Sequence, residues 1–314
     1  MASSRSPSAH ARSRKRRIIR HSLLANFLLL LVIFVLQLNG VWSGLSRIGA
    51  DSFLLPQSVI LTDANGTEIR RMYLEQDRLE LADEVFPPTL KQAVIAIEDE
   101  RYYTRSCIDL RAIARALKAN ALEFKSQGAS TITQQLMGNI FLDRRDKSFA
   151  RKIIEILLSC RLEHTASRDR ILGLYLNHMA FGGALYGAEE ASQTFFGVSA
   201  QRLSLAQSAV LAALLQRPTY FSPYGIHLYT TVSREVAASI RRGNIRSAEQ
   251  ISPDAVTMGL LGTTIPGARG PGVSLEGRTD LVLRAMQHSG FINDAERASA
   301  LRELRTMRFE RRQT

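Results

Sequence analysis

Apolar residues recur at every third or fourth position along most of the chain beyond residue 86. This spacing is typical of amphipathic helices that bury one face in a shared core. It predicts helices at 90–98, 109–122, 130–136, 149–162, 167–176, 203–215, 279–286 and 293–307. The run at 203–215 is apolar on nearly all sides, so we expect it to be central and buried. The fold is therefore predicted to be mainly α-helical.

Prolines and polar residues mark where several of these helices are expected to begin. Pro87-Pro88 suits a helix start because proline fits the first helical turn. Four later runs are preceded by side chains that can accept a hydrogen bond from the first turn, namely Asp109, Ser130, Ser167 and Asn293. These four residues are the predicted N-caps.

Two segments depart from the helical pattern. Residues 58–62 and 67–73 are rich in β-branched or alternating residues and flank an Asn-Gly pair at 65–66, which predicts a β-hairpin. Across 225–276 the periodicity fades, and glycine and proline gather in its second half. We interpret this second segment as an insertion or a flexible excursion of unknown role, with one short helix near 232–241.

The N-terminal 42 residues combine a basic segment with an apolar one. Residues 1–22 contain seven Arg or Lys and no Asp or Glu, and they are predicted to be disordered. Residues 23–42 are uncharged and have the length that a helix needs to cross a bilayer. A basic flank is retained in the cytoplasm. We therefore predict an uncleaved signal anchor with the rest of the chain outside the cytoplasm. A cleaved signal peptide is the alternative, but no Ala-x-Ala site follows.

The anchor explains most of the charge. The net charge of +12 divides into +7 in residues 1–22 and +5 in the remainder, so nucleic acid is not an expected partner. The two cysteines, Cys107 and Cys160, are either a disulfide, which an extracytoplasmic compartment allows, or two separate buried thiols. No Cys and His spacing typical of a metal site occurs.

Polar side chains gather between the apolar runs of 93–196. Glu98 and Asp99 directly follow an apolar helix, a setting that suits proton transfer, with a solvated helix end as the alternative. The run Ser130-Thr-Ile-Thr-Gln-Gln135 offers hydroxyls and amides. These groups either bind sugar hydroxyls or phosphate oxygens, or they only cap a helix.

Two further clusters are ambiguous when taken alone. Arg151 and Glu155 lie four residues apart on one helix face. They form either an exposed ion pair worth under about 0.5 kcal/mol or a cleft in which Arg151 and Lys152 neutralise phosphate. Tyr175-Leu-Asn177 leads into a glycine-rich stretch that does not match a GxGxxG loop and is typical of a tightly packed helix end.

The order of these clusters is more specific than any one of them. It resembles the family-51 glycosyltransferases, which are the peptidoglycan glycosyltransferase domains of class A penicillin-binding proteins and their monofunctional relatives. The motifs that carry the resemblance are Glu98-Asp99, 128–135, Arg151-Lys-x-x-Glu155, 171–177 and 203–206. The resemblance covers about 54–224 and resumes at Arg278-x-x-Leu-Val-Leu.

The resemblance implies a lysozyme-like helical domain with a small membrane-proximal jaw. The implied reaction polymerises lipid II onto a glycan chain carried by undecaprenyl pyrophosphate, with inversion at the donor sugar. Glu98 matches the general base and Glu155 the carboxylate that positions the acceptor. The implied substrate-binding residues are Asp99, Ser130, Thr131, Gln134, Gln135, Asn139, Lys147, Arg151, Lys152 and Asn177. The pyrophosphate charge is expected to need these cations or a Mg²⁺ or Mn²⁺ ion.

With this resemblance the chain divides into six predicted parts. They are a cytoplasmic basic tail at 1–22, a transmembrane signal anchor at 23–42, a linker and hairpin at 43–85, a glycosyltransferase core at 86–224, an insertion at 225–276 and C-terminal helices at 277–314 that complete the domain. The expected location is the cell inner membrane, with the catalytic domain in the periplasm. No Ser-x-x-Lys transpeptidase motif occurs, so a separate transpeptidase is an expected partner.

The chain departs from the family pattern at several positions. Tyr102 replaces phenylalanine, Arg105 replaces histidine, Cys107 replaces glycine and Gln207 replaces glutamate. Gly138 stands where the family has a lysine that contacts the pyrophosphate, and the expected substitutes are Arg105, Arg144 and Arg145. Two alternatives to the glycosyltransferase follow. One is an inactive scaffold that binds lipid II or glycan, and the other is a lytic, lysozyme-like enzyme.

Overall fold

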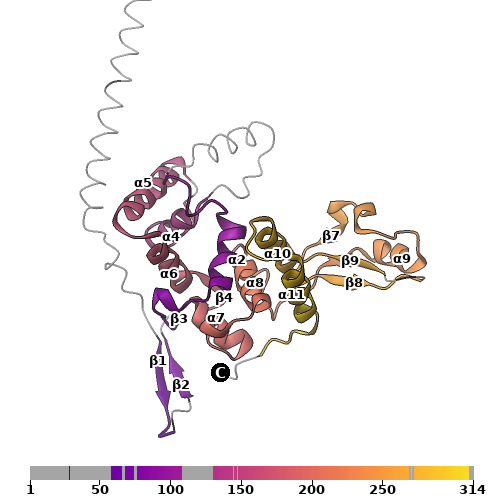
Figure 1. Ribbon diagram of the computed structural model, residues 1–314, viewed down its shortest axis with the longest axis horizontal. Coiled ribbons are helices and arrows are strands. Elements are labelled where there is room, and N and C mark those ends of the chain that lie inside the picture. Colours follow the sequence, from indigo (N-terminus) through magenta and orange to yellow (C-terminus); the bar gives the residue numbers. More distant parts are fainter. Residues whose placement is uncertain are drawn as a thin grey trace, which may run out of the picture. The chain divides into compact units, whose positions relative to one another are not determined.

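The computed structural model describes residues 58–65, 68–73, 76–107, 130–143, 145–146, 148–268, 270 and 272–310, together with Leu28 (Figure 1). All of these except Leu28 belong to one compact unit, Phe53–Thr314. The predicted tail at 1–22, the rest of the predicted anchor at 23–42 and the predicted helix at 109–122 lie outside the described residues. Among the helices described, none combines the length and the apolar character needed to span a membrane.

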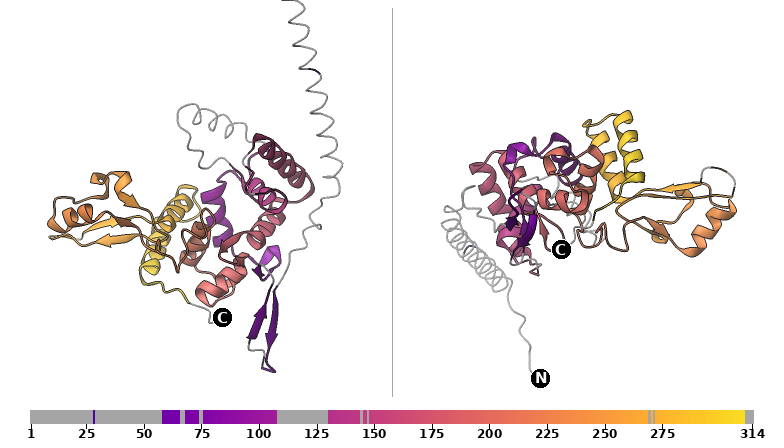
Figure 2. Two further views of the ribbon diagram at one scale, coloured as in Figure 1. Left: turned by 180° about the vertical axis from the view of Figure 1, so that it is seen from behind. Right: turned by 90° about the horizontal axis from the view of Figure 1, so that it is seen from below.

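Three helices form the centre of the unit. These are α2 (Pro88–Glu98), α8 (Leu205–Leu214) and α10 (Arg278–His288), which pack side by side (Figures 1 and 2). The apolar run 203–215 therefore forms a central helix, as predicted. Its alanines are completely buried, and such small side chains let neighbouring helices approach closely. The last helix, α11 (Asp294–Thr306), packs on both α8 and α10.

A second group of helices carries most of the polar clusters. It consists of α4 (Ile132–Phe141), α5 (Phe149–Thr165) and α6 (Arg168–His178), with α4 packed on the other two. Next along the chain come α7 (Ala188–Phe196) and the short 3-10 helix η3 (Ala200–Arg202). Another 3-10 helix, η2 (Asp83–Val85), packs against α6. The mainly helical prediction is confirmed.

The predicted caps are confirmed at three helix starts and wrong at one. Pro88 opens α2, Ser167 caps α6 and Asn293 caps α11. The cap of α4 is Thr131, whose hydroxyl accepts a hydrogen bond from Gln134 N over 3.2 Å, and not the predicted Ser130. Adjacent hydroxyls precede the same apolar run, so the sequence pattern does not distinguish them.

Gln207 has a structural reason to differ from glutamate. The α8 helix begins at Leu205 rather than at the predicted residue 203. Ser204 caps it by accepting from Gln207 N over 3.1 Å, and Gln207 Oε1 accepts from Ser204 N over 2.9 Å. A neutral amide serves this capping box as well as a carboxylate does.

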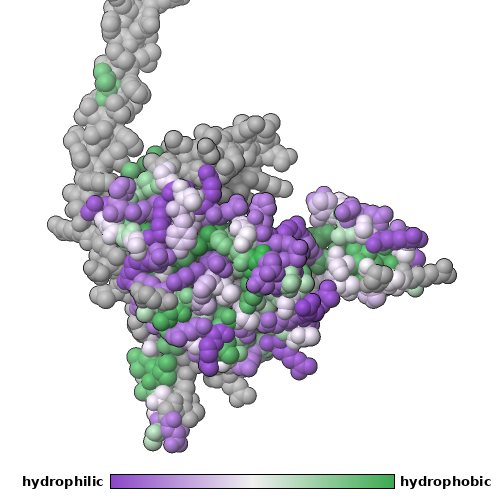
Figure 3. Space-filling model, viewed as in Figure 1, coloured by the Kyte–Doolittle hydropathy of each residue, from purple (hydrophilic) through white to green (hydrophobic). Residues whose placement is uncertain are grey.

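Short strands complete the unit. The predicted hairpin is confirmed as β1 (Val59–Thr62) and β2 (Glu68–Met72), which pair antiparallel. A small sheet has the order β3 (Asp77–Arg78), β5 (Leu185–Tyr186) and β4 (Ala180–Gly182). Hydrophobic side chains gather on the hairpin (Figure 3), where Val59, Leu61 and Met72 are exposed.

Residues 225–276 form a folded module with a small core of its own. Its strands are β6 (Thr231–Val232), β7 (Val256–Thr257), β8 (Thr263–Ile265) and β9 (Val273–Leu275), which pair as β6–β7 and β8–β9. The helix predicted near 232–241 is α9 (Arg234–Arg242), and two 3-10 turns, η4 (Ala248–Gln250) and η5 (Pro253–Ala255), follow. The buried residues of the core are Ile240, Ile251, Val273 and Leu275.

Candidate active site

Glu98 is the last residue of α2, and its carboxylate is largely buried. The helix ends there because Asp99 leaves the helical conformation, with φ −157° and ψ 70°. The Glu98 side chain is 12% exposed. Gln135 of α4 donates a hydrogen bond from Nε2 to Glu98 Oε2 over 2.8 Å. The carboxylate predicted for proton transfer is thus held by the predicted Gln-Gln pair.

Tyr175 of α6 determines which way the Gln135 amide points. Its hydroxyl donates to Gln135 Oε1 over 2.8 Å, so the amide NH₂ group faces Glu98. Burial raises the pKa of Tyr175 well above its usual value, and the negative charges of Glu98 and Asp99 raise it further. The tyrosine therefore remains a neutral donor that locks the amide in one orientation.

Glu155 of α5 is surrounded by cations. Lys152 Nζ donates to Glu155 Oε1, and Arg151 Nη1 lies 3.4 Å from Oε2. Lys152 also donates to Ser130 Oγ over 2.8 Å and to Gln134 Oε1 over 3.2 Å, which links α5 to the start of α4. Glu155 is 5% exposed, so the reading of this pair as an exposed surface ion pair is wrong.

A pocket of about 270 Å³ lies beside these groups. Its lining includes six of the predicted site residues, namely Ser130, Gln134, Gln135, Asn139, Arg151 and Glu155. The rest of the lining consists of Gly138, Met179, Ala180, Leu215, Gln216 and Pro218. This combination of amide, charged and apolar groups is typical of a pocket that orients an organic ligand. Glu98 adjoins the pocket through Gln135.

Gly138 leaves room for the guanidinium group of Arg151. A Cβ atom at position 138 would lie 3.4 Å from Arg151 Nη2 and 3.1 Å from Glu155 Oε2. Arg151 Nη2 also lies 3.5 Å from the carbonyl oxygen of Gly138. A basic group from α5 thus fills the space beside the position where the resembled family carries lysine.

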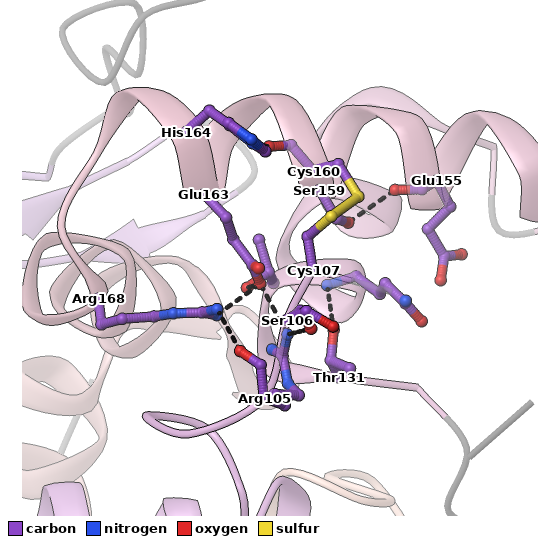
Figure 4. The surroundings of a disulfide bond; sticks show 12 residues. Arg105, Ser106, Cys107, Thr131, Glu155, Ser159, Cys160, Glu163, His164 and Arg168 are labelled. Atoms are coloured by element: carbon purple, nitrogen blue, oxygen red, sulfur yellow. Dashed lines mark hydrogen bonds and ion pairs between the residues drawn. A yellow bond between two sulfur atoms is a disulfide. The ribbon is translucent and has the colours of Figure 1, made fainter. Parts of the chain in front are cut away.

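Arg105 is buried in a network of charges (Figure 4). Its Nε and Nη2 atoms lie 2.8 Å and 2.7 Å from Asp99 Oδ2, and its Nη1 lies 3.0 Å from Glu163 Oε1. Burial alone would lower the pKa of Arg105, but the hydrogen bonds and charges of Asp99 and Glu163 raise it. Arg168 joins the network through Glu163 over 2.7 Å. Arg105 therefore supports Asp99 and does not line the pocket.

A disulfide lies next to this network. Cys107 and Cys160 are bonded, with their Cα atoms 5.0 Å apart (Figure 4). Of the two alternatives left open by the sequence, the disulfide is therefore the one the structure contains. It joins α5 to the loop that carries Arg105.

Three predicted site residues serve the scaffold. Asp99 accepts a hydrogen bond from the backbone N–H of Ile132 over 3.3 Å in addition to its ion pair. Thr131 caps α4. Asn177 is fully buried and bonds both backbone groups of Leu81, over 3.0 Å and 2.8 Å. None of these three lines the pocket.

The other basic residues named from the sequence lie away from the pocket or outside the described parts of the chain. Lys147 and Arg144 are in the second category. The Arg145 side chain is 95% exposed and lies 4.0 Å from Asp143. Neither Arg105 nor Arg145 therefore takes the place of the missing lysine in this structure.

Three contributors were not identified from the sequence as site residues. Tyr175 and Arg278 lie in motifs that carry the resemblance, but nothing in those motifs alone shows that both reach the Glu98 region. Arg278 Nη2 is 3.9 Å from Glu98 Oε1. Gln216 lines the pocket immediately after α8 and has no distinguishing pattern around it.

The pocket residues do not form a set of metal ligands. Within the described ranges, no three His, Cys, Asp or Glu side chains come together. Glu155 is the carboxylate among the pocket residues, and it is already paired with Lys152 and Arg151. Magnesium and manganese favour several oxygen ligands, so these residues do not fit either ion. The expectation of Mg²⁺ or Mn²⁺ stays a prediction.

Comparison with known families identifies this arrangement. The family model described as Transglycosylase matches residues 65–242, which is more than half of the chain. The chain belongs to the transglycosylase family. The matched range contains Glu98, Glu155 and the pocket residues of this transglycosylase, whereas Arg278 lies beyond it.

The transglycosylase is similar to penicillin-binding proteins. Penicillin-binding protein 1F of Bacillus subtilis (strain 168) is 35% identical over 213 residues, which cover 66% of this chain and 29% of that protein. Penicillin-binding protein 1A of Neisseria flavescens is 39% identical over 170 residues, which cover 56% and 21% of the two chains. The crystal structure of penicillin-binding protein 1A from Haemophilus influenzae aligns with a TM-score of 0.36 and 18% identity, covering 82% of this chain and 21% of that chain. The transglycosylase spans less than a third of the length of these relatives.

Proposed function

We propose that this transglycosylase is a peptidoglycan glycosyltransferase that polymerises lipid II into glycan strands. The observation that carries the proposal is the position of Glu98. Its carboxylate is held by Gln135, and Gln135 in turn lines the pocket that contains Glu155. Two buried carboxylates from different helices are thereby placed in separate environments, as acid–base chemistry at a sugar carbon requires.

In the proposed reaction Glu98 is the general base. Its Oε1 takes the proton of the acceptor sugar 4-hydroxyl while that oxygen attacks the anomeric carbon of the donor. The bond between the anomeric carbon and the pyrophosphate oxygen breaks, and the undecaprenyl pyrophosphate leaves with the electron pair. Attack opposite the leaving group inverts the anomeric centre.

Arg151 and Lys152 are the proposed cations for the pyrophosphate. Arg151 lines the pocket, and Lys152 bonds Ser130 and Gln134 at its wall. Arginine binds phosphate oxygens through a planar fork and lysine acts as a point charge. Since Arg151 fills the space beside Gly138, we assign to it the charge that the family lysine carries. Glu155 holds both cations and positions the acceptor.

We further propose that the protein acts at the cell inner membrane. The uncharged segment 23–42 and the basic tail 1–22 support a single-pass anchor with a periplasmic catalytic domain. A lipid-linked substrate would then reach the pocket from the membrane. The Cys107–Cys160 disulfide is compatible with an oxidising compartment. A separate transpeptidase is the proposed partner that cross-links the strands.

The test is polymerisation of purified lipid II by the full chain in detergent, followed by gel separation of the glycan products. Glu98→Gln keeps the shape and hydrogen-bonding capacity of the side chain but removes its basicity, so we expect the rate to fall by at least about a hundredfold. Glu100→Gln, a change at an exposed position two residues later, is the matched control and should retain activity.

The outcomes separate the alternatives. Folded wild-type protein that makes no polymer with magnesium, manganese and detergent varied would contradict the proposal. Binding of lipid II without turnover would instead favour the scaffold, which Gly138, Arg105 and Cys107 suggested. Release of soluble muropeptides from purified sacculi would favour the lytic enzyme.

A further inference from the structure

Arg278, at the start of α10, faces the carboxylate of Glu98. Its Nη2 lies 3.9 Å from Glu98 Oε1, and both side chains are 12% exposed. Gln135 occupies Glu98 Oε2, whereas Oε1 accepts no hydrogen bond from any residue that the structure describes. Burial lowers the pKa of Arg278, with the charge of Glu98 opposing that shift, but a guanidinium remains charged in proteins. A permanent positive charge therefore lies beside the oxygen that is left to take a proton.

The other groups around Glu98 do not supply such a charge. The helix α8, which packs on α2, contains no ionisable side chain. The α6 helix contributes the neutral Tyr175, and α4 contributes the Gln135 amide. The neighbouring Asp99 is negative, and its charge is matched by Arg105. Among the described residues, Arg278 is thus the cation paired with Glu98.

We propose that Arg278 is a positioning residue for the general base, keeping the largely buried Glu98 carboxylate ionised and oriented toward the acceptor hydroxyl. This inference rests on the proposed function. A base must begin its reaction without the proton, and burial beside apolar helices favours the protonated form of a carboxylate. An opposite charge at this distance reverses that preference by about one to three pH units.

The backbone before α10 fixes the place of Arg278. Arg278 N donates to Gly259 O over 2.8 Å, and Thr279 N donates to Leu260 O over 3.0 Å. A Cβ atom at Gly277 would lie 2.2 Å from the carbonyl carbon of Leu261, so glycine is required for this close approach. The end of the 225–276 module is therefore bonded to the turn from which Arg278 reaches Glu98.

The pH dependence of lipid II polymerisation tests the proposal. The rate of the full chain is measured from about pH 5.5 to 8.5, which spans the range where a carboxylate base takes up its proton. We expect Arg278→Gln to move the acid limb of the profile upward by about one pH unit or more. The rate near pH 6 then falls about tenfold, while the loss at high pH is smaller. Arg278→Lys keeps the charge and should retain most of the acid limb.

Arg284→Gln is the matched control, because Arg284 lies on the same helix but is half-exposed and pairs with Glu276. Its profile should follow the wild type. An acid limb that does not move in Arg278→Gln, or that moves equally in Arg284→Gln, would overturn the assignment.

A second measurement does not depend on activity. Urea unfolding of wild type, E98Q, R278Q and the double variant forms a double-mutant cycle. We expect R278Q to lower the unfolding midpoint in the wild-type background, where it leaves a buried carboxylate unpaired, and much less in the E98Q background. Equal losses in both backgrounds would refute the pairing.

The same cycle covers two other outcomes. If R278Q folds only when combined with E98Q, the pairing is supported, and if it unfolds in both backgrounds, the pairing is refuted. If wild type makes no polymer, the proposed function fails, whereas the cycle still decides whether Arg278 and Glu98 are coupled.

Discussion

At the scale of single residues, Gly138 shows how one missing side chain changes its neighbours. The guanidinium of Arg151 lies beside the glycine, and Glu155 Oε2 is closer still to the place a Cβ would take. The charge lost with the family lysine is thus replaced from another helix, and the replacement depends on the absence of a side chain at 138. Position 138 and Arg151 therefore have to be considered as a pair.

This pairing leads to a prediction about restoring the family residue. Gly138→Lys introduces a Cβ 3.1 Å from Glu155 Oε2, tighter than most such contacts, together with a second positive charge beside Arg151. We expect the kcat/KM for lipid II to fall about tenfold, which corresponds to about 1.4 kcal/mol. The double variant Gly138→Lys with Arg151→Ala should recover part of that loss. A single lysine variant that is faster than wild type would contradict the prediction.

The residue types at the site could be predicted from ordered motifs, but their contacts could not. Glu98, Gln135 and Glu155 were named because each falls in a motif, and the structure brings Gln135 to the carboxylate of Glu98. The orientation of the Gln135 amide depends on Tyr175, which is 40 residues away in the chain. The Glu98–Arg278 contact spans 180 residues, since 278 − 98 = 180. Periodicity and spacing describe neighbours along the chain, so they miss both contacts.

At the scale of elements, α5 combines two roles. Its first turns carry Arg151, Lys152 and Glu155, and its later turns carry Cys160 and Glu163. The disulfide from Cys160 and the ion pair from Glu163 to Arg105 both attach α5 to the loop that follows α2. That loop begins immediately after Glu98. The two proposed carboxylates of the reaction are consequently held by elements that are joined covalently.

We therefore expect the disulfide to contribute to stability. Replacing both cysteines with serine removes a crosslink with a sequence separation of 53 residues. Chain-entropy reasoning gives a loss of up to about 4 kcal/mol in the free energy of unfolding. Urea unfolding of the double variant against wild type measures it, with the reduced wild-type protein as the control that should resemble the variant. An unchanged midpoint would show that the crosslink does not constrain the unfolded chain.

Helices were better predicted from sequence than their exact starts. The apolar repeats indicated α2, α5, α6, α8 and α11, because burial of one helix face leaves a strong periodic record. The start of α4 was misplaced by one residue at Ser130, and that of α8 by two at 203. These errors arise where several residues in a row are compatible with a cap, and hydrogen-bond geometry rather than residue type selects one.

At the scale of the whole molecule, the 225–276 module explains why the helical pattern fades without structure being lost. Its strands are two or three residues long, too short for alternation to be recognised. Its core collects Ile240, Ile251, Val273 and Leu275 from separate elements. A core assembled from such scattered residues leaves no periodic trace, so an excursion was the natural sequence interpretation.

The Cys107–Cys160 bond also gives the chain a closed covalent ring. The ring contains the whole of α4 and the first part of α5, and with them Gln135, Gly138 and Glu155. A recognition site for a specific protease inserted after Arg145 would lie inside the ring. Cleavage there should leave one covalent molecule that runs as a single band on a non-reducing gel and separates into two fragments after reduction. The cysteine-to-serine double variant, cut at the same site, should give two fragments under both conditions. Backbone breakage between α4 and α5 would thus cost the enzyme no covalent connection as long as its surroundings remain oxidising.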